Sequence, residues 1–170
     1  MQETNKSEPG KATRIIIRPG TAADVRLIAE FIRSLAEFEK LEHEVTFSED
    51  QLRRTLFGNK RHAEVMLGFM EDKPAGFAVY YFTYSTFLAR PGLYLEDLFV
   101  KPQLRGKGIG TALFNRALKR AREEGCGRFE WSVLHWNSPA IEFYEKLGAQ
   151  AQKEWVRYRL DEKQIQQLSA

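Results

Sequence analysis

A glycine-rich loop between two differently patterned segments constrains the fold of this chain more than any other stretch. Residues 93–100 are largely apolar and predict a strand, and residues 111–124 carry apolar side chains at helical spacing and predict a helix. Residues 103–110 join the two and contain three glycines at every second position. A strand, a glycine loop and a helix in direct succession predict a sheet with helices packed against it.

The same patterns extend over the rest of the chain. Strands are predicted for residues 14–18, 64–70, 74–84, 93–100, 128–134 and 154–160, and helices for residues 25–41, 49–57, 111–124 and 138–147. Thr21 or Asp24 is expected to cap the first helix, and Ser48 the second. No repeat or linker interrupts the order, which predicts an α/β protein with a mixed sheet covered by helices.

Composition limits the possible classes of protein. The 170 residues, 43% of them hydrophobic, are enough for one domain, expected at residues 14–170 after a flexible tail at residues 1–13. The net charge is +3, from 26 basic and 23 acidic residues that are mixed along the chain, so nucleic acid is not expected as a partner. No apolar run is long enough to span a membrane. The one cysteine, Cys126, forms no intrachain disulfide, and a cytoplasmic protein is expected.

The glycine loop has a physical function that its position suggests. Backbone N–H groups at the start of a helix converge on one point and favour an anion, and glycines let a ligand approach the backbone closely. Gly106, Gly108 and Gly110 lack the spacing of a nucleotide P-loop and of the dinucleotide-binding fingerprint. The loop therefore predicts a site for another phosphate or pyrophosphate ligand, with a tight turn that binds no ligand as the alternative.

Three motifs in this order resemble the GCN5-related N-acetyltransferase (GNAT) family. Residues 105–110, preceded by Gln103, resemble the Q/R-x-x-G-x-G/A motif with which that family grips the pyrophosphate of coenzyme A, and residues 93–100 and 136–149 match its other patterns. The resemblance implies the GNAT fold, a central mixed, mostly antiparallel twisted sheet flanked by helices. It also implies acetyl-CoA as co-substrate, no metal, and a homodimer.

The resemblance assigns residues to the binding of acetyl-CoA. Backbone groups of the strand before the loop would hold the acetyl and pantetheine arm, the loop would hold the pyrophosphate, and one asparagine side chain would contact the cofactor. These residues are Leu98, Phe99, Val100, Arg105, Gly106, Lys107, Gly108, Ile109, Gly110, Thr111 and Asn137. For Asn137 a place at the start of a helix, beside Ser138 and Pro139, is a compatible alternative.

Acetyl transfer to an amine requires the removal of a proton, because an alkyl ammonium has a pKa of about 10.4. By resemblance Glu96 is the base, directly or through water, and Tyr144 is the acid that protonates the departing thiolate. Glu96 interrupts an apolar strand, where burying a carboxylate costs free energy, so its presence there favours a functional role. Asp97 is expected to face the opposite side of the strand and to be structural. The alternative for Tyr144 is a core tyrosine.

A narrower resemblance is to the diamine acetyltransferase branch, which includes the spermidine/spermine and thialysine enzymes. It is carried by residues 35–41, 80–86 and 94–97. It implies a small amine as acceptor, bound by Glu39, Tyr81, Ser85, Phe87 and Glu96, with Tyr84 completing an aromatic wall for a cation. The alternatives are a solvated helix glutamate for Glu39 and core or dimer packing for the aromatic residues. The polyamine enzymes have an acidic residue in place of Ser85 and tryptophan in place of Phe87.

Other functions are compatible with these motifs. The same fold could acetylate a protein N-terminus, a lysine or an antibiotic amine. The chain could also be a non-catalytic module that binds acyl-CoA. The three histidines, His43, His62 and His135, have no metal-like spacing, and no metal site is predicted.

Overall fold

The computed structural model describes residues 14–169, so the tail predicted at residues 1–13 lies outside the described residues. The described chain divides into two compact units, residues 14–132 and residues 133–169. Each unit has its own elements, and the first contains the whole sheet.

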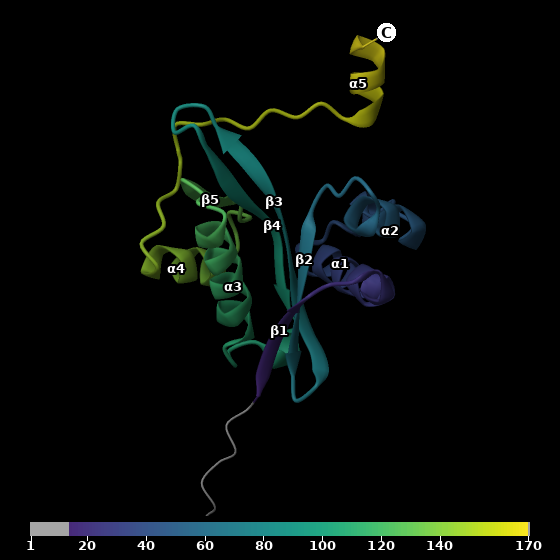
Figure 1. Ribbon diagram of the computed structural model, residues 1–170, viewed down its shortest axis with the longest axis vertical. Helices are drawn as coiled ribbons and strands as arrows, with labels where there is room; N and C mark the ends of the chain where they lie inside the picture. Colours follow the sequence, from purple (N-terminus) through teal and green to yellow (C-terminus); the bar gives the residue numbers. More distant parts are fainter. Residues whose placement is uncertain (1–13, 170) are drawn as a thin grey trace, which may run out of the picture. The chain divides into compact units, whose positions relative to one another are not determined.

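A five-stranded sheet forms the first unit, with its strands side by side in sequence order (Figure 1). The strands are β1 (Ile15–Pro19), β2 (Glu64–Met70), β3 (Lys73–Ser85), β4 (Arg90–Val100) and β5 (Arg128–Trp131). The first four pair antiparallel, and β5 runs parallel to β4. The predicted mixed, mostly antiparallel sheet is therefore confirmed.

Helices cover both faces of this sheet. Figure 1 shows α1 (Val25–Glu39) and α2 (Glu49–Phe57) on one face and α3 (Ile109–Glu123) on the other. On the α1 face, the ring of Phe31 stacks on Phe77 at 5.4 Å between centroids. On the α3 face, the helix approaches so closely that a Cβ on Gly68 would lie 3.3 Å from a methyl group of Ile109. Apolar burial on both faces fixes the path of β4 between them.

Local signals in the sequence set the helix boundaries. Thr21 and Asp24 form a reciprocal capping box around the short 3₁₀ turn η1 (Ala22–Asp24) that leads into α1. Ser48 caps α2, accepting a hydrogen bond from the Gln51 backbone N–H at 3.2 Å. Both predicted helix starts are confirmed, since α1 begins directly after Asp24 and α2 directly after Ser48. At α2 the Ser48 side chain satisfies a backbone group that has no partner within the helix.

The second unit contains α4 (Ser138–Lys146) and α5 (Glu162–Leu168). The first matches its prediction, whereas the predicted strand at residues 154–160 is wrong, because that segment has no regular structure. Its side chains are exposed, Trp155 by 76% and Tyr158 by 91%. An alternating pattern becomes a strand only when a neighbouring strand supplies hydrogen bonds, and none of the described residues does so here.

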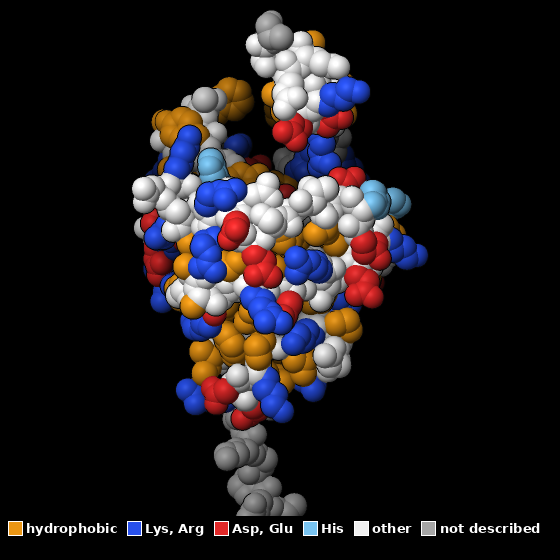
Figure 2. Space-filling view, turned by 90° about the vertical axis from the view of Figure 1, so that its right-hand side faces the viewer, with side chains coloured by type: hydrophobic (Ala, Val, Ile, Leu, Met, Phe, Trp, Pro, Cys, Tyr) orange, Lys and Arg blue, Asp and Glu red, His pale blue; other side chains and the backbone are white. Residues whose placement is uncertain are grey.

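The surface over α1 and α2 carries both signs of charge. Figure 2, which looks onto that side, shows acidic and basic side chains interspersed over the face, with no large area of a single sign. Such a surface exerts no strong directed field on a polyanion. None of the described helices is long and apolar enough to cross a membrane.

Candidate active site

The glycine loop leads directly into α3 in the conformation expected of an anion site. Gly106 and Gly108 have φ of 73° and 85°, in the left-handed region that favours glycine. Gly108 is the N-cap of α3, and no side chain caps this helix. A Cβ on Gly106 would meet no heavy atom within 4 Å. The loop is thus open beside Gly106, and within the described chain the start of α3 has no side-chain cap, which leaves its first N–H groups available to an anion.

Arg105 at the start of this loop is turned toward the other face of the sheet. Its Nε donates to the Val100 carbonyl oxygen at 3.1 Å, and its guanidinium lies 4.1 Å from the centre of the Phe38 ring. Burial lowers the pKa of Arg105. Its side chain thus holds the end of β4 against the end of α1, while the glycines that follow it form the start of α3.

β4 separates from β5 just before the loop. Their parallel pairing covers only Gly92 to Leu95 on β4, opposite β5 residues that end at Trp131. Residues 96–100 continue beside β3 but have no strand partner on the other side among the described residues. The backbone edge at Leu98, Phe99 and Val100 is thereby left open, which is where the sequence predicts the acetyl and pantetheine arm.

A β-bulge in β4 places the predicted base at an irregular position. Val79 pairs with Asp97 and the next residue, Tyr80, pairs with Leu95, so Glu96 is an extra residue in β4. Such a bulge locally ends the strict alternation of side chains. Asp97 precedes Phe99 by two residues, and Phe99 contacts Phe31 of α1, so Asp97 lies on the α1 face of the sheet.

Three carboxylates therefore meet on the α1 face. Burial, with the charges of Glu96 and Glu39 nearby, raises the pKa of Asp97 to about 7. Burial also raises the pKa of Glu39 at the end of α1. The expectation that Asp97 lies apart from this site is wrong, because the extra residue at the bulge shifts its face. Two consecutive carboxylates in an apolar strand marked this position as unusual, but the sequence did not show which face either side chain takes.

Aromatic side chains lie on the same face of the sheet. Tyr81 pairs with Tyr94 in the register, and their rings are 5.3 Å apart between centroids. The Tyr94 hydroxyl shares a hydrogen bond of 2.7 Å with the Ser132 hydroxyl. Sequence reasoning proposed Tyr81 and missed Tyr94. Together they form a ring surface on the strands that carry Asp97 and its partner Val79.

The other predicted acceptor residues lie at the β3–β4 turn. Ser85 is buried, and its Oγ accepts a hydrogen bond from the Leu88 backbone N–H at 3.3 Å. Phe87 is 95% exposed, and Tyr84 is 63% exposed. The structure therefore brings Glu39, Glu96 and Asp97 together but gives Ser85 a turn-stabilising contact.

Tyr144 and Asn137 belong to the second unit. Asn137 is the N-cap of α4, and its Oδ1 accepts a hydrogen bond from the Ala140 backbone N–H at 3.4 Å. Burial raises the pKa of Tyr144, whose ring packs edge-on against Phe143 at 5.4 Å. A tyrosine in this state keeps its proton at neutral pH and can donate it.

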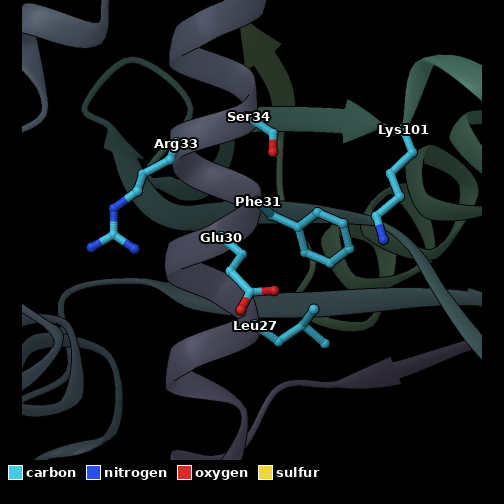
Figure 3. A pocket seen from close by; sticks show the side chains of 6 residues that line it. All are labelled: Leu27, Glu30, Phe31, Arg33, Ser34 and Lys101. Carbon is cyan, nitrogen blue, oxygen red and sulfur yellow. The ribbon is translucent and has the colours of Figure 1, made fainter.

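One cavity borders the α1 face of the sheet, and Phe31 in its wall contacts Phe99. It measures about 380 Å³ and is lined by α1 between Leu27 and Ser34 and by Lys101. Figure 3 shows Phe31 and Lys101 facing one another, with Arg33 directed to the other side of the helix. Glu39 lies eight residues further along α1 than Phe31, about 12 Å at 1.5 Å per residue. None of the predicted site residues lines this cavity.

Comparison with known proteins assigns a family to this fold and site. The sequence profile of the acetyltransferase (GNAT) family matches residues 30–149. The chain belongs to this family. A thialysine N-epsilon-acetyltransferase of Mus musculus is 37% identical over 164 residues, covering 90% of this chain and 96% of that protein. An L-ornithine N5-acetyltransferase of Arabidopsis thaliana is 32% identical over 189 residues, covering 85% and 83%.

Solved structures agree with the GNAT assignment. An integron cassette protein from the mobile metagenome of V. cholerae superposes with a TM-score of 0.76 at 26% identity, covering 94% of this chain and 99% of that one. An aminoglycoside acetyltransferase from an uncultured soil metagenomic sample shares the fold, with a TM-score of 0.73 at 19% identity, covering 86% of this chain and 95% of that one. The protein is thus an acetyl-transferring enzyme of the GNAT type.

Proposed function

We propose that this enzyme transfers an acetyl group from acetyl-CoA to a primary amine of a small diamine, polyamine or thialysine-like molecule. The observation that carries this proposal is the group of three carboxylates, Glu39, Glu96 and Asp97, on the strand that leads into the glycine loop and on the helix packed against it. Uncompensated carboxylates attract a cationic acceptor to the end of β4.

The glycine loop suits the pyrophosphate of acetyl-CoA. The uncapped start of α3 offers N–H donors, and the open space at Gly106 admits an anion without displacing a side chain. In this proposal residues 105–111 hold the pyrophosphate, the open edge of β4 holds the acetyl and pantetheine arm, and Asn137 contributes a side-chain contact. The thioester of this co-substrate supplies the activated acetyl group.

Two side chains are proposed to move protons. Glu96 removes a proton from the bound ammonium, through water, which frees the nitrogen lone pair to attack the thioester carbonyl. Backbone N–H groups at the open edge of β4 stabilise the oxyanion that forms. Tyr144 gives its proton to the departing thiolate, and its raised pKa keeps the hydroxyl protonated until the thiolate forms.

The acceptor class follows from charge and from the relatives. Several carboxylates close together favour an acceptor that carries more than one positive charge. The rings of Tyr81 and Tyr94 add a cation–π surface. Relatives named for thialysine and ornithine acetylation act on small molecules with an amine at the end of an alkyl chain. Both arguments support a small diamine or diamino acid.

A homodimer is part of the proposal. Exposed apolar side chains lie between α4 and α5, among them Trp155, Val156 and Tyr158, each at least 74% exposed. Monomeric proteins seldom leave several large apolar side chains of one short segment in water. A second copy of the chain is the proposed partner of this segment.

An acceptor screen with acetyl-CoA tests the proposal. Thialysine, ornithine, spermidine, a peptide with a free N-terminus and an aminoglycoside are each incubated with the enzyme, and acetylated products are detected by mass spectrometry. Acetylation of a diamine or diamino acid is expected. Acetylation of the peptide or the aminoglycoside alone would replace the proposed acceptor, and thiol release with none of them would refute acetyl transfer to amines of this kind.

Two variants test the assigned groups. Tyr144→Phe removes the proton donor while keeping the ring, and a fall in kcat of about 100-fold is expected. Glu96→Gln keeps the shape but not the charge, and a similar fall in kcat/KM is expected. Unchanged turnover in either variant would remove that residue from its proposed role.

A further inference from the structure

Asp97 has no contact within the described residues that explains its charge. It lies on the α1 face of the sheet beside Val79, and no hydrogen bond or ion pair to its carboxylate is found in the described part of the chain. The charged groups that act on it are Glu96 on its own strand and Glu39 on α1, both of the same sign. A carboxylate that is partly buried beside charges of its own sign binds a proton more tightly than usual.

We propose that Asp97 receives the proton that the acceptor ammonium loses, with Glu96 relaying it through water from the more exposed position at the bulge. This inference rests on the proposed function and assigns the proton's destination within it. The bulge supplies the geometry, because the extra residue brings two consecutive side chains of one strand into the same site.

The protonation steps balance without any further reactant. The ammonium gives one proton to the Asp97 carboxylate and becomes a neutral amine. The amine nitrogen bonds to the acetyl carbon, the carbon–sulfur bond breaks, and the thiolate takes a proton from Tyr144. The second nitrogen proton is lost as the amide forms and restores Tyr144 through solvent. Asp97 then releases its proton to water, so one proton is set free for each amide formed.

Asp97 suits this role better than Glu96 alone. With a pKa of about 7, Asp97 is ionised in part of the molecules at neutral pH, and its ionised form is a stronger base toward an ammonium than a carboxylate of lower pKa. The pair therefore combines access to the amine with a stable place for the proton.

The pH dependence of kcat/KM tests the proposal, since it reports groups of the free enzyme. In the wild type kcat/KM is expected to rise with pH through a group near pH 7. Asp97→Asn should lose this rise and should fall about 100-fold at pH 8. Glu96→Gln should keep the rise but move it to lower pH, because one repelling charge is removed. Asp72→Asn, at an exposed turn, is the control and should match the wild type.

The outcomes separate this inference from the proposed function. A wild type that acetylates no amine refutes both. An active wild type whose rise near pH 7 persists in Asp97→Asn, or vanishes in Glu96→Gln, refutes only the role of Asp97. Glu39→Gln provides a measurement that does not depend on the folding of the Asp97 variant. It should also move the rise to lower pH, and a rise at an unchanged pH would overturn the proposal.

Discussion

Asp97 should reduce the stability of the folded chain at neutral pH. Its pKa rises from 3.8 to about 7 on folding, so between these pH values the native state holds a proton that the unfolded state has lost. The free energy of unfolding therefore falls as the pH rises from about 4 to about 7. Asp97→Asn removes this partly buried charge. We expect the variant to match the wild type near pH 4 and to exceed its free energy of unfolding by about 2 kcal/mol above pH 7, with partial access to water reducing the full effect.

Urea unfolding at pH 4.5 and pH 8 measures this difference. Asp72→Asn is a matched control, because Asp72 is exposed and asparagine accepts its positive φ of 62° as readily as aspartate does. It should change the free energy of unfolding at neither pH. A stabilisation by Asp97→Asn that is equal at both pH values would show that charge is not its cause.

The start of α1 should depend on one ion pair. Arg18 donates to the two carboxylate oxygens of Asp24 at 2.8 and 2.7 Å. These hydrogen bonds, together with those that Thr21 donates to Asp24, hold the pKa of Asp24 far below its usual range. Asp24→Asn should lower the free energy of unfolding by about 2 kcal/mol at pH 7. Because a depressed pKa stabilises the fold only above the unfolded value, this difference should shrink as the pH falls below about 4.

A solvent-exposed ion pair serves as the control for the Arg18–Asp24 pair. Arg26 and Glu30 on α1 are 3.5 Å apart and largely exposed to solvent, so Glu30→Gln should change the free energy of unfolding by less than about 0.5 kcal/mol. Thermal and urea unfolding of both variants at pH 7 and pH 3 give the comparison. An Asp24→Asn effect that is independent of pH would contradict the ionic explanation.

A side chain added to the glycine loop should affect the binding of acetyl-CoA more than the stability of the fold. Gly106 and Gly125 have positive φ of 73° and 65°, and a Cβ on either meets no heavy atom within 4 Å. Alanine at each position should therefore cost about 1 kcal/mol of stability from backbone strain alone. Only Gly106→Ala should raise the KM for acetyl-CoA, by about tenfold, because its methyl group points into the proposed anion site. Equal KM values in the two variants would move the anion site elsewhere.

Sequence patterns predicted the helices and strands correctly wherever the interactions that determine them are local. Ser48, the Thr21–Asp24 pair and the glycines before α3 act within a few residues of their own position, and helices begin directly after each of them. The face of Asp97 was not predictable by counting, since one extra residue in β4 reverses every side chain beyond it. The expected strand at residues 154–160 failed because pairing requires a partner that a pattern cannot specify.

The whole molecule should associate through the segment that forms no strand. Residues 154–160 contain four apolar and three charged side chains, and Trp155 and Tyr158 are 76% and 91% exposed. We expect light scattering to give twice the chain mass for the wild type. Trp155→Ser combined with Tyr158→Ser should raise the dimer dissociation constant by at least about 100-fold, since buried aromatic side chains dominate interfaces. Leu168→Ser is the control: Leu168 in α5 is 74% exposed, as Val156 is, and its loss should leave the dissociation constant unchanged. A monomeric wild type, or a dimer that survives the double substitution, would assign those exposed aromatic side chains to a different partner.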